Sequence, residues 1–248
     1  MLYLYHLLTH SKIIMSNLKG KKAVVIGGSS GIGLETTRFL SQGGAQVIVG
    51  SRRGVMPEEL NGVTAQSVDV LDRNALQAFF ASVGEIDYLV NAATGGARAV
   101  GPFMEMDLDG FQGSFAKLWG YTNSVRLGAG YVKDSGAIVL VSGYPARKCK
   151  TGYIAISTVG NAVEGFVRGI APELAPKRIN VVSPGLIDTP MFAQQGSERD
   201  EFLSNSTNHH LIPRAGKPEE VAKGIMFALE NEFVTGTTID VDGGALLS

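Results

Sequence analysis

The sequence predicts an α/β protein: a Rossmann-like, doubly wound parallel sheet of about seven strands in a single domain. Short apolar runs alternate with amphipathic segments of helical length along the chain. The first of these runs leads directly into a glycine-rich turn and then a helix. No internal repeat or low-complexity linker divides the chain. Strands joined through helices are parallel, so helices are expected on both faces of the sheet.

The predicted strands are short apolar runs bounded by glycine or polar residues. Parallel strands that are buried on both faces have this pattern, because neither face alternates with polar side chains. The strands are predicted at Ala23–Ile26, Val47–Val49, Val63–Val68, Ile86–Val90, Ala137–Val141, Ile179–Val182 and Thr237–Val241. Ligands of such a sheet bind at the carboxyl ends of its strands.

The segments between these strands carry apolar residues at helical spacing. Helices are predicted at Gly31–Ser41, Asn74–Val83, Leu108–Val132, Ile156–Leu174 and Glu219–Leu229. The long connection Met191–Arg214 shows no recognisable chemistry, so the sequence names no substrate.

Composition excludes several classes of function. The 248 residues are 44% hydrophobic and 18% charged, which suits a chain with a sizeable core. A net charge of −1 argues against electrostatic binding of nucleic acid. The single cysteine, Cys149, excludes an internal disulfide and favours a reducing, cytoplasmic location. No histidine or cysteine cluster has metal-ligand spacing, and no metal site is expected.

Residues 1–14 contain an apolar run that is too short for a membrane span, so no membrane partner is expected. Met15 is followed by a short polar stretch and the first strand. We expect Met15 to be the natural start, residues 15–248 to form the domain, and residues 1–14 to be upstream sequence. The alternative is a genuine but loosely held extension.

The glycine-rich turn after the first strand is the strongest local signal for a ligand. Glycines at a strand-to-helix turn let the backbone approach a pyrophosphate, and the helix amino terminus adds free N–H groups and the positive end of its dipole. The candidate phosphate-binding residues are Gly27, Ser29, Ser30, Gly31 and Ile32.

The spacing of Gly27, Gly31 and Gly33 resembles the T-G-x-x-x-G-I-G loop of the short-chain dehydrogenase/reductase family, with Ile26 in place of threonine. The resemblance runs from about Leu18 to Leu247 and implies a dinucleotide cofactor. Further matches imply cofactor contacts at the adenine, central and nicotinamide parts of the site. They fall at Asp69 and Val70, at Asn91, Ala92 and Ala93, and at Pro184, Gly185, Ile187 and Thr189.

Ser51, Arg52 and Arg53 follow the second strand. NAD-preferring members of the family tend to carry an acidic residue at the position of Ser51. Because that acid is absent and two guanidinium groups follow, NADP(H) is the expected cofactor. The alternative is a solvated basic pair.

The catalytic pattern of the family is not matched. Its members use a tyrosine and, four residues later, a lysine, together with a serine and an upstream asparagine. No alignment of the predicted helix yields Y-x-x-x-K: one places Ile156 and Gly160 at these positions, and another places Tyr153 and Ser157 there. The sequence is therefore interpreted as a divergent member that lacks the motif.

Replacement groups for this chemistry lie nearby in the sequence. Lys117 occupies the asparagine position, Ser142 adjoins Gly143 at the serine position, and Tyr153 or Tyr144 is a candidate proton donor. With Lys117, Ser142 and Tyr153 as catalytic residues, the chain is predicted to be an NADP(H)-dependent oxidoreductase with an atypical site for hydride transfer between carbonyl and alcohol. The alternative is a catalytically silent, cofactor-binding regulatory or scaffold protein.

Partners are predicted less directly. A small-molecule substrate and a homo-oligomer, a tetramer by family resemblance, are expected. Trp119 and Phe115 are candidates for a subunit interface or, alternatively, for the core. His209 and His210 are expected to be solvent-exposed loop residues, with substrate contact as the alternative.

Overall fold

The computed structural model describes residues 17–94 and 98–248, and these form one seven-stranded parallel sheet with helices on both faces. The predicted fold class is therefore confirmed. The expectations about residues 1–14 and Met15 lie outside the described residues. The strands are β1 (Lys22–Ile26), β2 (Gln46–Ser51), β3 (Val63–Ser67), β4 (Ile86–Asn91), β5 (Val132–Val141), β6 (Arg178–Pro184) and β7 (Thr238–Val241).

Seven α-helices and three short 3-10 helices connect the strands within the described residues. The α-helices are α1 (Gly31–Gln42), α2 (Arg73–Val83), α3 (Leu108–Ser114), α4 (Ala116–Gly128), α5 (Ile154–Leu174), α6 (Gly196–Thr207) and α7 (Pro218–Glu230). The 3-10 helices are η1 (Phe103–Glu105), η2 (Ala129–Tyr131) and η3 (Tyr144–Ala146).

The sheet has the strand order β3-β2-β1-β4-β5-β6-β7. From β1 the chain first runs outward through β2 to β3 and then crosses to β4 on the other side of β1. The connections that follow β1 and β4 therefore separate in opposite directions, which opens a crevice at the carboxyl ends of these two strands. This crevice is where the fold places a ligand.

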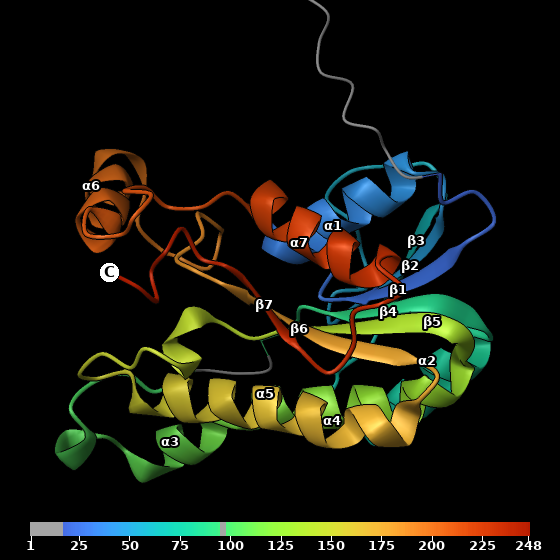
Figure 1. Ribbon diagram of the computed structural model, residues 1–248, viewed down its shortest axis with the longest axis horizontal. Coiled ribbons are helices and arrows are strands. Elements are labelled where there is room, and N and C mark those ends of the chain that lie inside the picture. Colours follow the sequence, from blue (N-terminus) through green and yellow to red (C-terminus); the bar gives the residue numbers. More distant parts are fainter. Residues whose placement is uncertain (1–16, 95–97) are drawn as a thin grey trace, which may run out of the picture.

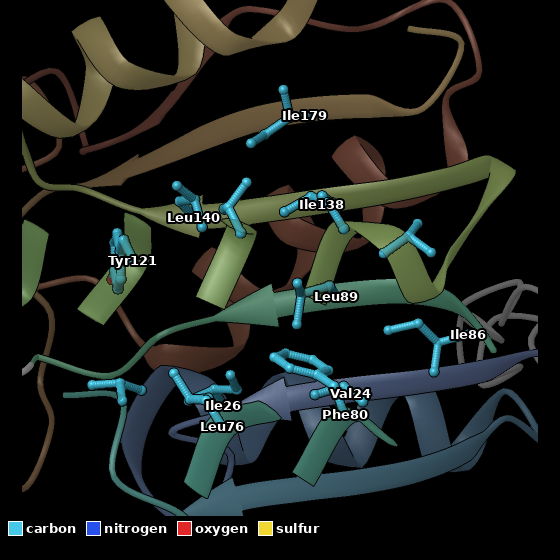
Figure 2. Close-up of a cluster of buried hydrophobic side chains, with 14 of the residues drawn as sticks. Val24, Ile26, Leu76, Phe80, Ile86, Leu89, Tyr121, Ile138, Leu140 and Ile179 are labelled. Carbon is cyan, nitrogen blue, oxygen red and sulfur yellow. The ribbon is translucent and has the colours of Figure 1, made fainter. Parts of the chain in front are cut away.

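Three layers are visible in Figure 1, with α1 and α7 on one face of the sheet and α2, α4 and α5 on the other. Each face has its own apolar core. Figure 2 shows the core on the side of α2, α4 and α5, where side chains of β1, β4 and β5 meet Leu76, Phe80 and Tyr121. No helix in the described residues is long and apolar enough to cross a membrane.

The predicted helix Leu108–Val132 is wrong in its extent. Phe115, with φ −72° and ψ −8°, ends α3 and caps α4, so the segment is two helices. At the other end Val132 pairs with Ile86 and begins β5. This pairing through the sheet, which helical periodicity does not reveal, ends the helical segment early.

The connection Met191–Arg214, for which no element was predicted, contains α6. Leu203 and Thr207 are the buried residues of this helix, so its apolar face is too narrow to give a sequence signal. In Figure 1, α6 lies at the end of the molecule toward which β6 and β7 point.

Phe80 provides a test of the core. The side chain is fully buried, and its ring contacts those of Phe79 and Tyr131. Phe80→Ala should lower the free energy of unfolding by about 3–5 kcal/mol, because it removes a buried ring and leaves a cavity. Phe233→Ala, at a fully exposed phenylalanine, should change it by about 0.5 kcal/mol or less. Denaturant titration measures both; equal effects would contradict this assignment of the core.

Candidate active site

A cleft of about 1290 Å³ lies at the carboxyl ends of the strands. All three predicted catalytic residues line it, and so do all predicted cofactor residues except Asn91. One half of the cleft contains the glycine-rich turn with Ser51–Arg53 and Asp69. The other half contains Lys117, Tyr144 and Tyr153. We refer to these as the glycine-turn half and the lysine half.

The glycine-rich turn is held by direct backbone contacts. A Cβ on Gly33 would lie 2.1 Å from the carbonyl oxygen of Gly27, and a Cβ on Gly27 would lie 2.7 Å from the Ala93 nitrogen. Gly27 also has a φ of +80°. A side chain at either position would therefore push β1, α1 or the end of β4 apart. The space thus kept open at the start of α1 fits the pyrophosphate of a dinucleotide.

Asn91, which was predicted as a cofactor ligand, lies behind the residues that line the cleft, and its contact with a cofactor stays a prediction. The residue is fully buried, its amide donates to Ser124 Oγ at 2.9 Å, and its Oδ1 accepts from the Ala93 backbone N–H at 3.0 Å. Both ends of the side chain are thus used inside the protein. Asn91 shapes the turn that presents Ala92 and Ala93 to the cleft.

Arg52 and Arg53 are exposed at the end of β2 on the cleft wall. Among the described residues neither forms a salt bridge. The Ser51 hydroxyl accepts from the backbone N–H of Gly54 at 3.1 Å, so it stabilises the turn that carries the two arginines. Two guanidinium groups without an acidic partner are available to a phosphate.

Lys117 extends from the first turn of α4 into the lysine half of the cleft. Its amine donates to the carbonyl oxygen of Ser142 at 3.2 Å and lies 5.5 Å from the centre of the Tyr121 ring. Burial of the amine, together with the positive charge of Arg98, lowers the pKa of Lys117 to about 7. The amine therefore exchanges a proton near neutral pH, as a general acid or base requires.

The other two predicted catalytic residues have different surroundings. Ser142 is buried, and its hydroxyl donates to the carbonyl oxygen of Gly160 at 3.3 Å. Tyr153 stands at the amino terminus of α5 and lines the cleft beside Lys150, whose amine lies 5.6 Å from the ring centre. Tyr144, in η3, also lines the cleft, and burial raises the pKa of its hydroxyl. The phenols of Tyr121, Tyr144 and Tyr153 and the amines of Lys117 and Lys150 therefore share the lysine half.

The two alignments of the family's tyrosine and lysine differ in what they bring to the cleft. Ile156 and Gly160 of the ungapped alignment both line it, whereas of Tyr153 and Ser157 in the other alignment, Tyr153 alone does. Gly160 is packed against η3: a Cβ there would lie 2.8 Å from Ala146 Cβ and 3.4 Å from Ser142 Oγ. A side chain at this position would require α5 and η3 to separate. In the ungapped alignment, this close packing leaves no room for the lysine side chain that the family has here.

The whole chain does contain one Y-x-x-x-K spacing, Tyr144 to Lys148, so the statement that the motif is lacking holds only for the predicted helix. These residues lie in and just after η3 rather than in an α-helix. The Lys148 amine donates to the carbonyl oxygen of Ala245 at 2.8 Å and is not among the cleft-lining residues. The spacing therefore does not bring the ammonium of Lys148 beside the Tyr144 hydroxyl in the cleft.

Two cations of the lysine half were missed from the sequence. Arg98 and Lys150 lie in connections outside the long helices, yet both line the cleft with Lys117. No spacing in the sequence could have identified them, because the path of these connections in space brings them together. In the described part of the chain no group of three or more histidine, cysteine, aspartate or glutamate side chains is placed to hold a metal ion.

The two histidines differ from each other. His209 is exposed, as expected, whereas His210 is buried and its ring packs edge-on against Tyr144 with 6.1 Å between centroids. The expectation of an exposed pair is therefore wrong for His210. Burial lowers the pKa of this imidazole, with the nearby His209 adding to the effect. His210 is not among the cleft-lining residues and supports Tyr144 from behind.

The glycine-rich turn gives a direct test. Gly33→Ala places a Cβ against the Gly27 carbonyl, so it should lower the unfolding temperature and weaken dinucleotide binding at least tenfold. Gly169→Ala is the matched control, because that exposed glycine of α5 has no atom within 4 Å of the new Cβ. It should keep full binding and stabilise the helix by about 0.5–1 kcal/mol. Calorimetry with cofactor measures both; full binding by Gly33→Ala would contradict the proposed cradle.

Comparison with known proteins agrees with this geometry. A family model described as enoyl-(acyl carrier protein) reductase matches residues 26–245. The short-chain dehydrogenase/reductase ATR9 of Stachybotrys chlorohalonatus is 28% identical over 94% of this chain and 100% of its own. Carbonyl reductase family member 4 of Xenopus laevis is 32% identical over 92% of this chain and 98% of its own.

A solved structure described as a small-chain dehydrogenase in complex with NADPH is also similar. It superimposes with a TM-score of 0.83 at 30% identity and covers 92% of this chain and 99% of its own. The matched region runs from the glycine-rich turn through β7. The chain therefore belongs to the short-chain dehydrogenase/reductase family of NAD(P)-binding oxidoreductases.

Proposed function

We propose that this protein binds NADPH and reduces the carbonyl group of a small molecule, with Lys117 as the central functional side chain. One observation carries the proposal: a single cleft combines a glycine cradle, two unpaired arginines and a lysine whose pKa is near neutrality. The NADPH complex of a similar structure and the carbonyl reductase name of a relative support the cofactor and the reaction class.

The residues of the glycine-turn half fit an NADP dinucleotide. The open turn at Gly27–Gly33 would hold the pyrophosphate, and Arg52 and Arg53 would hold the additional phosphate on the adenosine ribose. When bound, the reduced cofactor supplies the hydride. The remaining work of the reaction, which is to orient the carbonyl and protonate its oxygen, falls to the lysine half.

Lys117 is proposed as the proton donor. As an ammonium it would polarise the substrate carbonyl and then give one proton from Nζ to the oxygen, on which negative charge develops as the hydride arrives. Tyr153 and Tyr144 stand in the same half and would position the substrate or return a proton to Lys117. The backbone carbonyl of Ser142 accepts a hydrogen bond from the Lys117 amine and would hold the amine in position.

A second candidate is a catalytically silent, cofactor-binding regulatory or scaffold protein. The observation that favours it is that neither alignment with the family brings a lysine to the motif position: Gly160 stands there in one and Ser157 in the other. This candidate keeps the glycine cradle and the arginines but gives Lys117 no chemical task. The two candidates therefore differ in what happens when Lys117 is replaced.

We also propose a cytoplasmic homo-oligomer. Trp119 is 56% exposed on α4, which excludes it from the core and leaves the interface as its expected place. Phe103, Met104 and Leu108 add further exposed apolar surface at η1 and the start of α3. The free, exposed thiol of Cys149 suits a reducing compartment.

The choice of cofactor is tested by titration. The protein should bind NADPH more tightly than NADH, because Arg52 and Arg53 have no acidic partner among the described residues. The double variant Arg52→Ala with Arg53→Ala should weaken NADPH binding about tenfold or more and leave NADH binding nearly unchanged. Arg126→Ala, at an exposed arginine of α4 outside the cleft, is the control. Equal affinity of the wild type for the two cofactors would contradict the proposal.

The role of Lys117 is tested by the pH dependence of carbonyl reduction. With a proton donor whose pKa is about 7, kcat/KM should be constant at lower pH and fall about tenfold per pH unit above that value. Arg98, Lys150, Tyr144 and Tyr153 also line this half of the cleft, so the assignment requires a variant.

Lys117→Arg keeps a positive charge but does not release its proton in this range, so it should be slow and should lose the alkaline fall. Lys117→Ala should reduce the rate by about a hundredfold or more while the chain stays folded. NADPH oxidation across a panel of ketones and aldehydes measures both. A Lys117→Ala variant with the rate and pH profile of the wild type would eliminate this role.

A further inference from the structure

The lysine half of the cleft carries positive charge without a matching carboxylate. Arg98, Lys117 and Lys150 all line it. Among the described residues that line the whole cleft, the sole acidic side chain is Asp69, which follows β3 in the glycine-turn half. The charge of Asp69 is partly used locally, since its Oδ1 accepts from the Leu71 backbone N–H at 2.9 Å.

The contacts of the three cations confirm that they lack counter-charges within the described residues. Lys117 donates to a backbone carbonyl, Arg98 contacts the thioether sulfur of Met191, and Lys150 lies over the Tyr153 ring. Two other arginines of the protein are paired with carboxylates. Arg147 meets Glu164 and Asp240, and Arg199 meets Asp188.

Arg98 and Lys117 are also close enough to oppose each other, because the charge of Arg98 contributes to the lowered pKa of Lys117. Removing an ammonium from water beside a second cation is unfavourable unless a negative charge accompanies it. On the proposed function, the phosphates of the cofactor occupy the glycine turn and the arginines that follow β2. The nicotinamide ring brings no negative charge, so an anion that pairs with the cations of the lysine half would come from the substrate.

We propose that the substrate is a small oxo acid. Its carboxylate carbon is bonded directly to the carbonyl carbon that is reduced, or is separated from it by one further carbon. Arg98 would bind the carboxylate, since its planar guanidinium matches two carboxylate oxygens. Lys117 would then face the carbonyl oxygen. Val100, Phe192 and Phe202 also line the cleft and would receive the apolar remainder of the molecule. This inference rests on the proposed function and names its substrate class.

Binding of matched probes tests the charge requirement without turnover. Oxamate and oxamide have nearly the same shape, but only oxamate carries a carboxylate. With the protein saturated with NADPH, calorimetry should show oxamate binding at least tenfold more tightly than oxamide. Arg98→Gln should remove most of this preference, whereas Arg126→Gln, outside the cleft, should keep it. Methylphosphonate, in the same titration, distinguishes a phosphate-type anion from a carboxylate.

Turnover gives a second readout. The wild type should reduce 2-oxobutanoate with a kcat/KM at least tenfold higher than that for methyl 2-oxobutanoate, and Arg98→Gln should lose this ratio mainly through KM. Equal binding of oxamate and oxamide, a preference that survives Arg98→Gln, or preference for methylphosphonate would each overturn the inference. Because NADPH affinity is measured first, such a result with cofactor bound leaves the proposed function standing. Failure to bind NADPH overturns both.

Discussion

The structure depends above all on a contact between backbones at the end of β1. The Gly27 carbonyl faces Gly33, and the Cα of Gly27 faces the peptide that joins Ala92 and Ala93. β1, α1 and β4 thus meet with no side chain between them. This closeness lets α1 begin directly under the crevice of the sheet, so its free N–H groups face the space where the connections after β1 and β4 separate. One steric constraint therefore sets both the packing of the layers and the open space at the start of α1.

In the lysine half, the position and protonation of Lys117 depend on its electrostatic surroundings. Burial, with Arg98 nearby, brings the pKa of Lys117 into the neutral range, and the amine keeps one fixed partner, the Ser142 carbonyl. That carbonyl belongs to the residue that follows β5, so the sheet itself sets the position of the amine. A helix residue is thereby anchored to the strand end beside which the substrate is expected to lie. This arrangement gives a flexible side chain a defined position.

The features that could be predicted from the sequence are those that depend on residues close together in the chain. The apolar strands, the glycine-rich turn and the arginines after β2 each consist of consecutive residues. In the structure, the turn, the arginines and the carboxyl ends of several strands lie at the cleft. The motif that contains Asn91 does not show which way its side chain faces, and in the structure this side chain is turned into the protein. The positions of Arg98 and His210 depend on how the connections between strands and helices fold. Hydrophobic periodicity gives no information about these positions. The spacing of Tyr144 and Lys148 was overlooked, and it has no catalytic geometry because η3 is not an α-helix.

The change at Gly160 bears on how the two candidate functions should be judged. A glycine left by simple loss of a lysine would leave space where the side chain had been. Here Ala146 fills that space so closely that a Cβ would overlap it, and Asn161, the next residue, bonds the Ala146 carbonyl. The α5–η3 contact is therefore a packed arrangement, and η3 is the element that carries Tyr144 into the cleft. The contact of Gly160 with Ala146 therefore also holds η3, and with it the Tyr144 phenol, in the half of the cleft that contains Lys117. A site built around Lys117 would need this arrangement, while a scaffold would need the same contact only for stability, so the chemistry at Lys117 and not the packing distinguishes the two candidates.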